Sequence, residues 1–333
     1  MVKKSKKIAQ PDFVPPMLAT LADEYFSSDE WIYEHKFDGV RCLAFKENGT
    51  VRLMSRNKHT MNNEYPEIVT ALKKQKADNF IIDGEIVATK KGFSDFELLQ
   101  SRINLKDFER IQAKIKDVPI ALCVFDIIYK NGSDMRHLPL LERKAILKKL
   151  LAYNKLVLFT EHVTGKGIPF FHKACHSKWE GVIAKKADST YEGRRSRSWL
   201  KFKCIMQQEL VIGGFTTSRG LRSDFGALLV GYFEKGKFKY AGKVGTGFSQ
   251  QTLELLGKKM RALEIKKCPF IDCDASLKGV HWIKPKLVAE IGFAQWTRGG
   301  KLRVGRYKGL RTDKDAQDVV KEIPKAIPGL KNR

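Results

Sequence analysis

The chain has 333 residues, of which 43% are hydrophobic and 30% charged, enough for about two domains with apolar cores and too rich in apolar residues for general disorder. Lys and Arg total 62 against 37 Asp and Glu, so the net charge of +25 predicts a polyanionic partner. Six cysteines without a C-x-x-C pair exclude a disulfide scaffold, and no apolar run reaches the roughly 18 residues of a membrane span.

From the cysteine content we expect reduced thiols and a cytoplasmic protein, with no membrane partner. The basic N-terminus, with lysines at 3, 4, 6 and 7, is followed by prolines instead of an apolar segment. It is therefore not a secretory signal, and we expect a solvated arm that touches nucleic acid.

Residues 1–203 predict a mixture of strands and helices. Alternating and β-branched stretches predict strands, and apolar residues at helical spacing predict helices. Strands are expected at 31–36, 40–45, 51–54, 80–82, 85–88, 119–129, 181–186 and 199–203, and helices at 65–76 and 140–151. Asp83 and Gly84 are expected to break the strand around them.

Residues 204–333 form the more strongly basic part, with 25 basic and 12 acidic residues against 37 and 25 in residues 1–203. Its predicted strands at 210–215, 226–233, 238–244 and 287–294 are short and separated by glycines, with one helix at 250–263. Short strands with one helix are typical of a small β-barrel of the OB type. We place the boundary within 204–209, which gives domains 1–205 and 206–333.

The predicted strand 31–36 ends with Lys36, a candidate nucleophile. Lys36 precedes the turn Asp38-Gly39, and on its own this pattern fits an exposed hairpin lysine equally well. A lysine amine attacks only after it loses a proton, and its usual pKa is about 10.4. Burial, neighbouring cations or a metal can lower that pKa and make the amine a nucleophile.

Several further segments supply cations and carboxylates in a fixed order. They are Ser55-Arg56-Asn57, Asp83-Gly84-Glu85, Phe125-Asp126, Glu180 to Lys185 and Lys201-Phe202-Lys203. Because side chains alternate along a strand, Lys201 and Lys203 are expected on one face. Two basic side chains in one pocket would clamp a polyphosphate.

Taken together, these segments resemble the nucleotidyltransferase motifs of the ATP-dependent DNA ligases, within the lysine nucleotidyltransferase superfamily that includes mRNA capping enzymes. The motifs match as K-x-D-G-x-R at 36–41, S-R-x at 55–57, D-G-E at 83–85, aromatic-Asp at 125–126, E-G-x-x-x-K at 180–185, the lysine pair at 201 and 203, and R-x-D-K at 311–314. The resemblance runs from about residue 16 to 320. It is closest to the ligase domain of bacterial ligase D, on residues 16–20, 193–196, 211–215 and 309–311.

The resemblance implies an α+β chain of two domains, in which a mixed α/β, ATP-grasp-like nucleotidyltransferase (adenylation) domain precedes an OB-fold barrel. It implies that Lys36 takes AMP from ATP, that AMP passes to the 5′-phosphate of a nick, and that the 3′-hydroxyl then displaces it. The catalytic residues it implies are Lys36, Lys201, Lys203, Arg311, Asp313 and Lys314.

The resemblance also implies a binding role for each remaining motif residue. Glu34 would lie near the adenine amino group, and Phe125 would stack on adenine. Arg41 and Glu85 would lie beside the ribose, Arg56 would hold the 5′-phosphate of the nick, and Lys201 and Lys203 would contact the α-phosphate. Glu180, with Glu85, would hold Mg²⁺ or Mn²⁺. Arg311, Asp313 and Lys314 would act on pyrophosphate in the first step only, which makes the domain boundary a hinge.

The implied partners are nicked or broken duplex DNA and a Ku-type end-binding protein, in DNA repair or end joining, with the chain as a monomer. Two alternatives remain open: an RNA ligase or capping-type nucleotidyltransferase, and a non-catalytic nucleic-acid-binding module. The intact motif lysines and Glu180 argue against the second, because binding alone needs charge but not this constellation. His172, Cys175 and His176 lie one helical turn apart but lack a second ligand pair, so we expect no zinc site.

Overall fold

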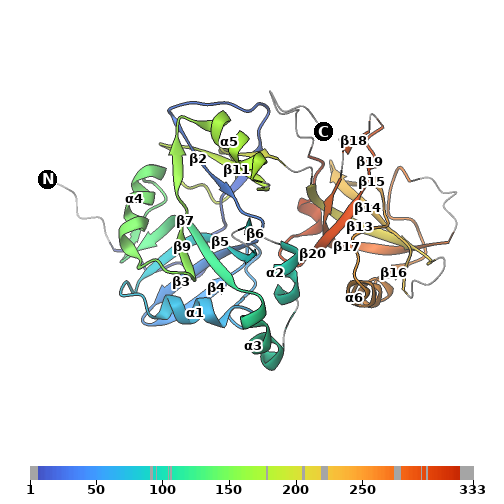
Figure 1. Cartoon of the computed structure of the whole chain (residues 1–333), viewed down its shortest axis with the longest axis horizontal. Helices are drawn as coiled ribbons and strands as arrows, with labels where there is room; N and C mark the ends of the chain where they lie inside the picture. The colour runs from blue at the N-terminus through green and yellow to red at the C-terminus, as the bar shows by residue number, and fades with distance from the viewer. Residues whose placement is uncertain are drawn as a thin grey trace. The chain divides into compact units, whose positions relative to one another are not determined.

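The computed structural model describes residues 7–322, except 91–92, 95, 104, 106, 178, 205–206, 219–223, 274–278, 294 and 298. The chain divides into two compact units, one with the residues up to 205 and the other with residues 206–323 (Figure 1). Most of the N-terminal arm predicted to be solvated, residues 1–6, lies outside the described residues.

Two β-sheets form the framework of the first unit. The five-stranded sheet has the order β1 (Leu18–Leu21), β12 (Arg195–Lys203), β11 (Gly181–Lys186), β2 (Trp31–Lys36), β10 (His162–Thr164). The seven-stranded sheet has the order β4 (Thr50–Met54), β3 (Val40–Glu47), β5 (Phe80–Lys90), β7 (Ile120–Lys130), β8 (Ser133–Asp134), with β6 (Phe93–Ser94) on β5 and β9 (Val157–Phe159) on β7. The predicted strands 31–36 and 181–186 are confirmed with unchanged bounds.

The described part of the first unit has five helices, of which the first, second, fourth and fifth pack on the sheets. They are α1 (Pro66–Lys73), α2 (Phe96–Ile103), α3 (Phe108–Asp117), α4 (Leu140–Leu150) and α5 (Gly167–His176). Helix α1 has proline at its first position and Lys73 in its last turn, which suits the helix dipole. Sequence reasoning predicted α1 and α4 but did not predict α2 and α3.

Apolar clusters hold these layers together. Ile68, Leu99 and Leu147 pack with the seven-stranded sheet on the side of α1, α2 and α4. Phe171 and Phe202 belong to the cluster between α5 and the five-stranded sheet. A third cluster joins residues of both sheets, among them Phe45, Phe125 and Trp199. The order of layers is therefore helices, sheet, sheet, helix, and the inner faces of the two sheets meet at the third cluster.

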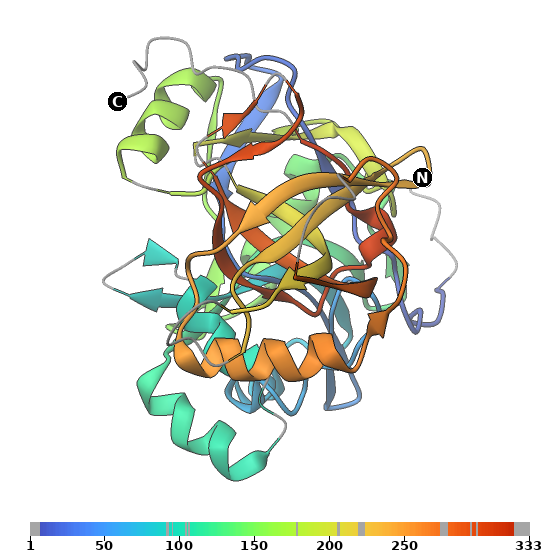
Figure 2. The ribbon, with the colours of Figure 1, turned by 90° about the vertical axis from the view of Figure 1, so that its right-hand side faces the viewer.

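The second unit is the OB-fold barrel expected from its short strands. Its main sheet has the order β15 (Lys237–Val244), β14 (Leu228–Glu234), β13 (Gln207–Thr216), β17 (Val280–Gly292), β16 (Glu264–Ile265), with β20 (Arg306–Arg311) on β17. The remaining elements are α6 (Gln250–Arg261), β18 (Gln295–Trp296), β19 (Leu302–Arg303) and the 3-10 turn η1 (Ala316–Asp318). Figure 2 shows the long strands curving round on themselves, with α6 alongside.

Several predicted strand bounds were wrong, among them the start of β12 at Arg195 instead of residue 199 and the start of β13 at Gln207 instead of residue 210. Asp83 and Gly84 do not break a strand, because β5 runs through them and a register shift against β7 absorbs the irregularity. A Cβ at Gly84 would lie 2.8 Å from the Cys123 carbonyl oxygen, so glycine permits the close approach of the two strands. Strand β17 begins at Val280, seven residues earlier than predicted, and includes Pro285.

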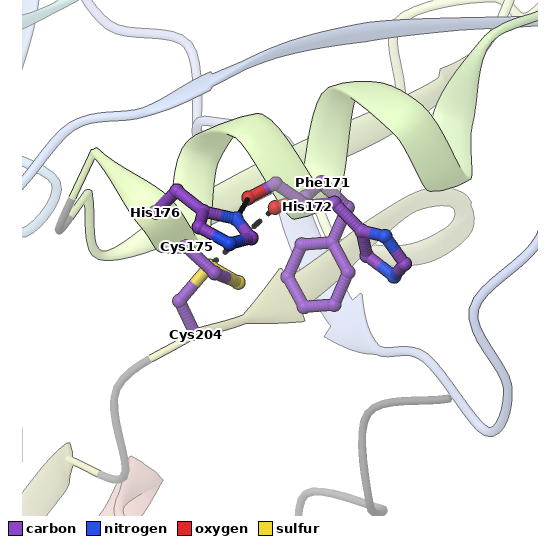
Figure 3. Close-up of a disulfide and its surroundings, with 5 residues drawn as sticks. All are labelled: Phe171, His172, Cys175, His176 and Cys204. Atoms are coloured by element: carbon purple, nitrogen blue, oxygen red, sulfur yellow. Dashed lines mark hydrogen bonds between the residues drawn. A yellow bond between two sulfur atoms is a disulfide. The ribbon is translucent and has the colours of Figure 1, made fainter. Parts of the chain in front are cut away.

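The prediction that all cysteines are reduced was also wrong. Cys175 in α5 and Cys204, which follows β12, form a disulfide (Figure 3). Cys42, Cys123, Cys268 and Cys273 are free thiols. Among the helices of the described residues, none is long and apolar enough to cross a membrane.

Candidate active site

The central feature of the site is the inner face of three neighbouring strands, β2, β11 and β12. Side chains alternate along each strand, so Tyr33, Val182 and Phe202 pack toward α5, while their neighbours face the other sheet. The charged members of the inward set are Glu34, Lys36, Lys185, Lys201 and Lys203. The strand register places Gly181 between Lys36 and Lys203, which brings the two lysines to the same end of the sheet.

The predicted nucleophile Lys36 pairs directly with a carboxylate. Its Nζ contacts Glu180 Oε1, and the two side chains are 19% and 7% exposed. Burial and the nearby Lys203 would lower the pKa of Lys36, but Glu180 outweighs them and raises it. In this arrangement Lys36 is therefore a protonated ammonium, and a protonated amine has no lone pair with which to attack.

Gly39 fixes the turn that follows the nucleophile. A Cβ at this position would lie 2.3 Å from the Ile86 carbonyl oxygen and 2.9 Å from Glu85 Cγ. Only glycine lets the turn approach β5 this closely. The K-x-D-G spacing thus brings Glu85 of the seven-stranded sheet next to the turn after Lys36.

Glu34 is held at the centre of a buried ionic cluster. Its Oε1 accepts a hydrogen bond from Lys144 Nζ at 2.5 Å, and its Oε2 lies 2.5 Å from Lys185 Nζ. All three side chains are about 2% exposed. Burial would raise the pKa of Glu34, but the two ammonium groups outweigh it and lower that pKa. Burial lowers the pKa of Lys185 to about 8.

Phe125 lies beside this cluster, between the two sheets. Lys185 Nζ is 4.2 Å from the centre of its ring and 4.1 Å from that of Trp199, and the Arg41 guanidinium is 4.9 Å from Phe125. These distances are typical of cation–π contacts. Since Phe125 is only 8% exposed, a base can stack on it only if a side chain that now covers the ring moves.

Two bidentate ion pairs brace the motif residues. Arg41 donates from Nε and Nη2 to Asp83 at 2.6 Å each, and Tyr191 donates its hydroxyl to the same carboxylate. Arg143 of α4 donates to both oxygens of Asp126 at 2.8 Å. Planar guanidinium–carboxylate pairs of this kind fix orientation, so Asp83 and Asp126 anchor the strands that carry Glu85 and Phe125.

Besides Lys185 Nζ, which is ion-paired with Glu34, three buried polar atoms around the Glu34 cluster have no hydrogen-bond partner among the described residues. They are Thr160 Oγ1, His162 Nδ1 and Trp199 Nε1. The carbonyl of Thr160 accepts a hydrogen bond from Lys144. Burial lowers the pKa of His162, and the charges of Lys144, Glu34 and Lys185 also influence that pKa. Buried polar groups are seldom left unpaired, so this region suits a polar ligand.

The carboxylates available for a metal are Glu180 and Glu85. In the part of the chain that the structure describes, no three His, Cys, Asp or Glu residues form a metal-binding group. Mg²⁺ is commonly held by one or two carboxylates together with water and substrate phosphates, so this donor set fits Mg²⁺. Of the residues considered for zinc, His176 donates a hydrogen bond from Nδ1 to the His172 carbonyl at 2.8 Å, and Cys175 forms the disulfide.

The R-x-D-K residues belong to the second unit and are mostly buried there. Arg311 donates to both oxygens of Asp313 at 2.9 Å and lies 3.5 Å from Glu290. The side chains of Arg311 and Asp313 are each 7% exposed. Lys314 is the more accessible member, 21% exposed and 3.0 Å from Glu209. The Arg311–Asp313 pair therefore shapes the end of β20, and Lys314 is the cation presented to solvent.

The structure brings together some predicted site residues and separates others. Lys36, Glu180 and Lys203 meet at one end of the five-stranded sheet. Lys185 on the inner face of that sheet contacts both Glu34 and the ring of Phe125, which belongs to β7 of the other sheet. Arg56 follows β4 at the edge of the other sheet. Sequence reasoning missed Lys144, because α4 has several lysines and only packing distinguishes the buried one.

Comparison with known proteins identifies the family. The model of the "ATP dependent DNA ligase domain" matches residues 16–203, and that of the "ATP dependent DNA ligase C terminal region" matches residues 221–314. The chain belongs to the ATP-dependent DNA ligase family. The first match lies within the first unit of the structure, and the second match lies within the second unit.

The relatives of this chain include longer proteins that are named for end joining. It is 34% identical to the multifunctional non-homologous end joining protein LigD of Pseudomonas aeruginosa and 36% identical to LigD of Mycobacterium tuberculosis, over 99% and 96% of this chain but 39% and 41% of theirs. It is also similar to a solved structure of mycobacterial DNA ligase D complexed with ATP and MES, with a TM-score of 0.66, 33% identity and coverage of 93% and 98% of the two chains. The chain spans about two fifths of the length of these LigD relatives.

The Glu34 cluster gives a stability prediction. We expect Lys144→Met to lower the free energy of unfolding by about 3 kcal/mol, because it leaves the buried Glu34 carboxylate with one counter-ion instead of two. Lys148→Met, on the same helix, removes an exposed pair with Glu161 and should cost less than about 1 kcal/mol. Urea unfolding of both variants measures the difference, and equal losses would contradict the role assigned to Lys144.

Proposed function

We propose that this chain joins DNA strands in an ATP-dependent reaction at 5′-phosphate/3′-hydroxyl nicks. The observation that carries the proposal is the Lys36–Glu180 pair beside Lys203, on the inner face of a fold whose family is that of ATP-dependent DNA ligases. A structural lysine needs no such surroundings, since exposure would satisfy it. A nucleophile needs a partner that holds it and cations that receive a phosphate.

In the first step, the neutral amine of Lys36 attacks the α-phosphorus of ATP and pyrophosphate leaves, which forms a Lys–AMP phosphoramidate. Lys201 and Lys203 lie on the same face of β12, and their ammonium groups offset the charge that develops on the α-phosphate. The 5′-phosphate of the nick, held by Arg56, then takes AMP from Lys36. The 3′-hydroxyl attacks that activated phosphate and releases AMP.

Glu180, with Glu85, would hold Mg²⁺. When bound, this ion screens the phosphate charges and lowers the barrier to attack at phosphorus. Because Glu180 also pairs with Lys36, a Glu180 carboxylate engaged elsewhere no longer raises the pKa of Lys36. The same carboxylate therefore links the readiness of the nucleophile to the presence of the substrate and its ion.

The base of ATP would occupy the region between Phe125 and the Glu34 cluster. Glu34 accepts hydrogen bonds and suits the adenine amino group, and Phe125 offers a ring for stacking. The unpaired atoms of Thr160, His162 and Trp199 support a polar ligand here. Arg41 and Glu85 are proposed beside the ribose, and the Asp83 carboxylate fixes Arg41 for that contact.

The second unit would contribute pyrophosphate contacts in the first step and a basic DNA-binding surface throughout. Arg311 and Asp313 stabilise each other, so Lys314 is the residue we expect to meet pyrophosphate directly. The likeness to LigD proteins supports a role in double-strand-break end joining in the bacterial cytoplasm, with a Ku-type partner. We propose that the chain acts as a monomer on nicked or broken duplex DNA.

Replacement of the nucleophile tests the chemistry. Lys36→Arg should abolish labelling of the protein by α-labelled ATP, because a guanidinium does not lose its proton near neutral pH. Sealing of a pre-adenylylated nick should persist at a reduced rate. Lys116→Arg, at an exposed position of α3, should label like the wild type. A labelled Lys36→Arg protein, or label from GTP in preference to ATP, would contradict the proposal.

The second prediction separates the steps by domain. Deletion from residue 310 onward would remove Leu310 and Val319 from the barrel core, so a point variant is the sharper test. Lys314→Ala should slow self-adenylylation at least about tenfold, because a tenfold change corresponds to the loss of one charge-assisted contact. The variant should change the rate of sealing of a pre-adenylylated nick little. Lys237→Ala, exposed on β15, is the control. Weaker nick binding with normal labelling would instead identify a DNA contact.

The third prediction concerns the net charge. Each neutralised phosphate releases counterions, so affinity for nicked duplex DNA should fall by at least about 100-fold between roughly 50 and 200 mM salt. Fluorescence anisotropy with a labelled nicked duplex measures this dependence. Affinity that stays constant over this range would exclude an electrostatic grip on DNA.

A further inference from the structure

Thr160 has a buried hydroxyl that no group of the described residues satisfies. The residue is 4% exposed, and its Oγ1 has no hydrogen-bond partner. Both of its backbone groups are paired, since its N–H donates to the Val124 carbonyl at 2.8 Å and its carbonyl accepts from Lys144 Nζ at 3.0 Å. A buried hydroxyl without a partner costs free energy of folding, so its presence at this position needs a reason.

The strand register places this hydroxyl beside Phe125. The bond from Thr160 to Val124 continues the parallel pairing of β9 with β7, in which Val124 lies opposite Phe159. Val157 and Phe159 pack with the apolar cluster on the side of the helices. Because side chains alternate, Thr160 faces the other side of the sheet, where Phe125 belongs to the cluster between the two sheets.

The same segment also reaches the Glu34 cluster. Two residues after Thr160, His162 of β10 lies opposite Glu34 of β2, so these two side chains share the inner face of the five-stranded sheet. Lys144 Nζ donates both to Glu34 and to the Thr160 carbonyl. Thr160 therefore lies where the chain passes from one sheet to the other, between the Phe125 ring and the Glu34 carboxylate.

We infer that Thr160 takes part in base recognition, and that its unpaired hydroxyl donates a hydrogen bond to a ring nitrogen of adenine. This inference rests on the proposed function, in which the base occupies the region between Phe125 and the Glu34 cluster. The ionised Glu34 carboxylate only accepts hydrogen bonds and suits the amino group of adenine. The ring nitrogens N1 and N7 of adenine carry no hydrogen and need a donor, which the threonine hydroxyl supplies.

The role of the hydroxyl has opposite consequences for stability and for binding. If the hydroxyl is unpaired in the free protein, its removal relieves a desolvation cost and does not lower the stability of the fold. If it binds the base, its removal weakens the affinity for ATP. A hydroxyl with a purely structural role gives the reverse pattern, with lower stability and unchanged affinity.

The experiment uses the full chain with Thr160→Val, which keeps the shape of the side chain. Calorimetric titration with ATP, with divalent cations withheld so that no AMP is transferred, should give a dissociation constant at least about threefold higher than that of the wild type. The midpoint of urea unfolding should be no lower than that of the wild type. Thr160→Ser, which retains a hydroxyl, should bind ATP within about twofold of the wild type.

Analogues of ATP identify the atom of the base. The wild type should bind either 1-deaza-ATP or 7-deaza-ATP more weakly than ATP, by about the factor that Thr160→Val loses for ATP. That analogue should then bind the wild type and Thr160→Val equally, because each change removes the same hydrogen bond. Losses that multiply for both analogues would overturn the contact with a ring nitrogen.

The matched control is Thr20→Val. The Thr20 hydroxyl donates to the Ser196 carbonyl at 3.0 Å, so this substitution should lower the urea midpoint and leave the affinity for ATP unchanged. A lower midpoint for Thr160→Val would overturn the inference, because the hydroxyl would then be paired in the free protein, and an unchanged affinity for ATP would overturn it as well. A wild type that neither binds ATP nor takes label from it would overturn the proposed function together with this inference, whereas a wild type that labels normally leaves only the inference at stake.

Discussion

The ion pair between Lys36 and Glu180 is the interaction on which the site depends. It joins the end of β2 to the start of β11 and keeps the proposed nucleophile protonated inside a crowded set of cations. Lys203 lies next to the same pair through the strand register. Burying an ammonium group without a carboxylate costs free energy of folding. The Glu180 carboxylate therefore makes it possible for Lys36 to be largely buried.

The two faces of the five-stranded sheet follow from the alternation of side chains along its strands. Because side chains alternate, the same three strands give an apolar face to α5 and a charged face to the other sheet. The charged face is stable only because each buried ion has partners, as Glu34 has Lys144 and Lys185. Removing one partner of such a buried ion pair is strongly destabilising, so Lys144 and Lys185 together hold the Glu34 carboxylate in place.

Much of this could be predicted from the sequence, and the exceptions have physical causes. The Lys36 turn, the lysine pair at 201 and 203 and the basic barrel all depend on local pattern. Lys144 could not be singled out, because its burial depends on how α4 packs on β7 and not on its neighbours in sequence. The Cys175–Cys204 bond joins residues 29 apart, and cysteine connectivity is not encoded in spacing. Asp83 and Gly84 mislead because a turn-like pair lies within a long strand, where it supports Arg41 instead of ending the strand.

We expect the first chemical event to be covalent and to occur at one residue. Incubation of the full chain with ATP and Mg²⁺, followed by intact-mass and peptide mass spectrometry, tests this most directly. We expect one AMP adduct per chain, located on Lys36 and lost on addition of excess pyrophosphate. An adduct on another lysine, or no adduct under conditions in which the protein seals nicks, would contradict the proposed Lys36–AMP intermediate.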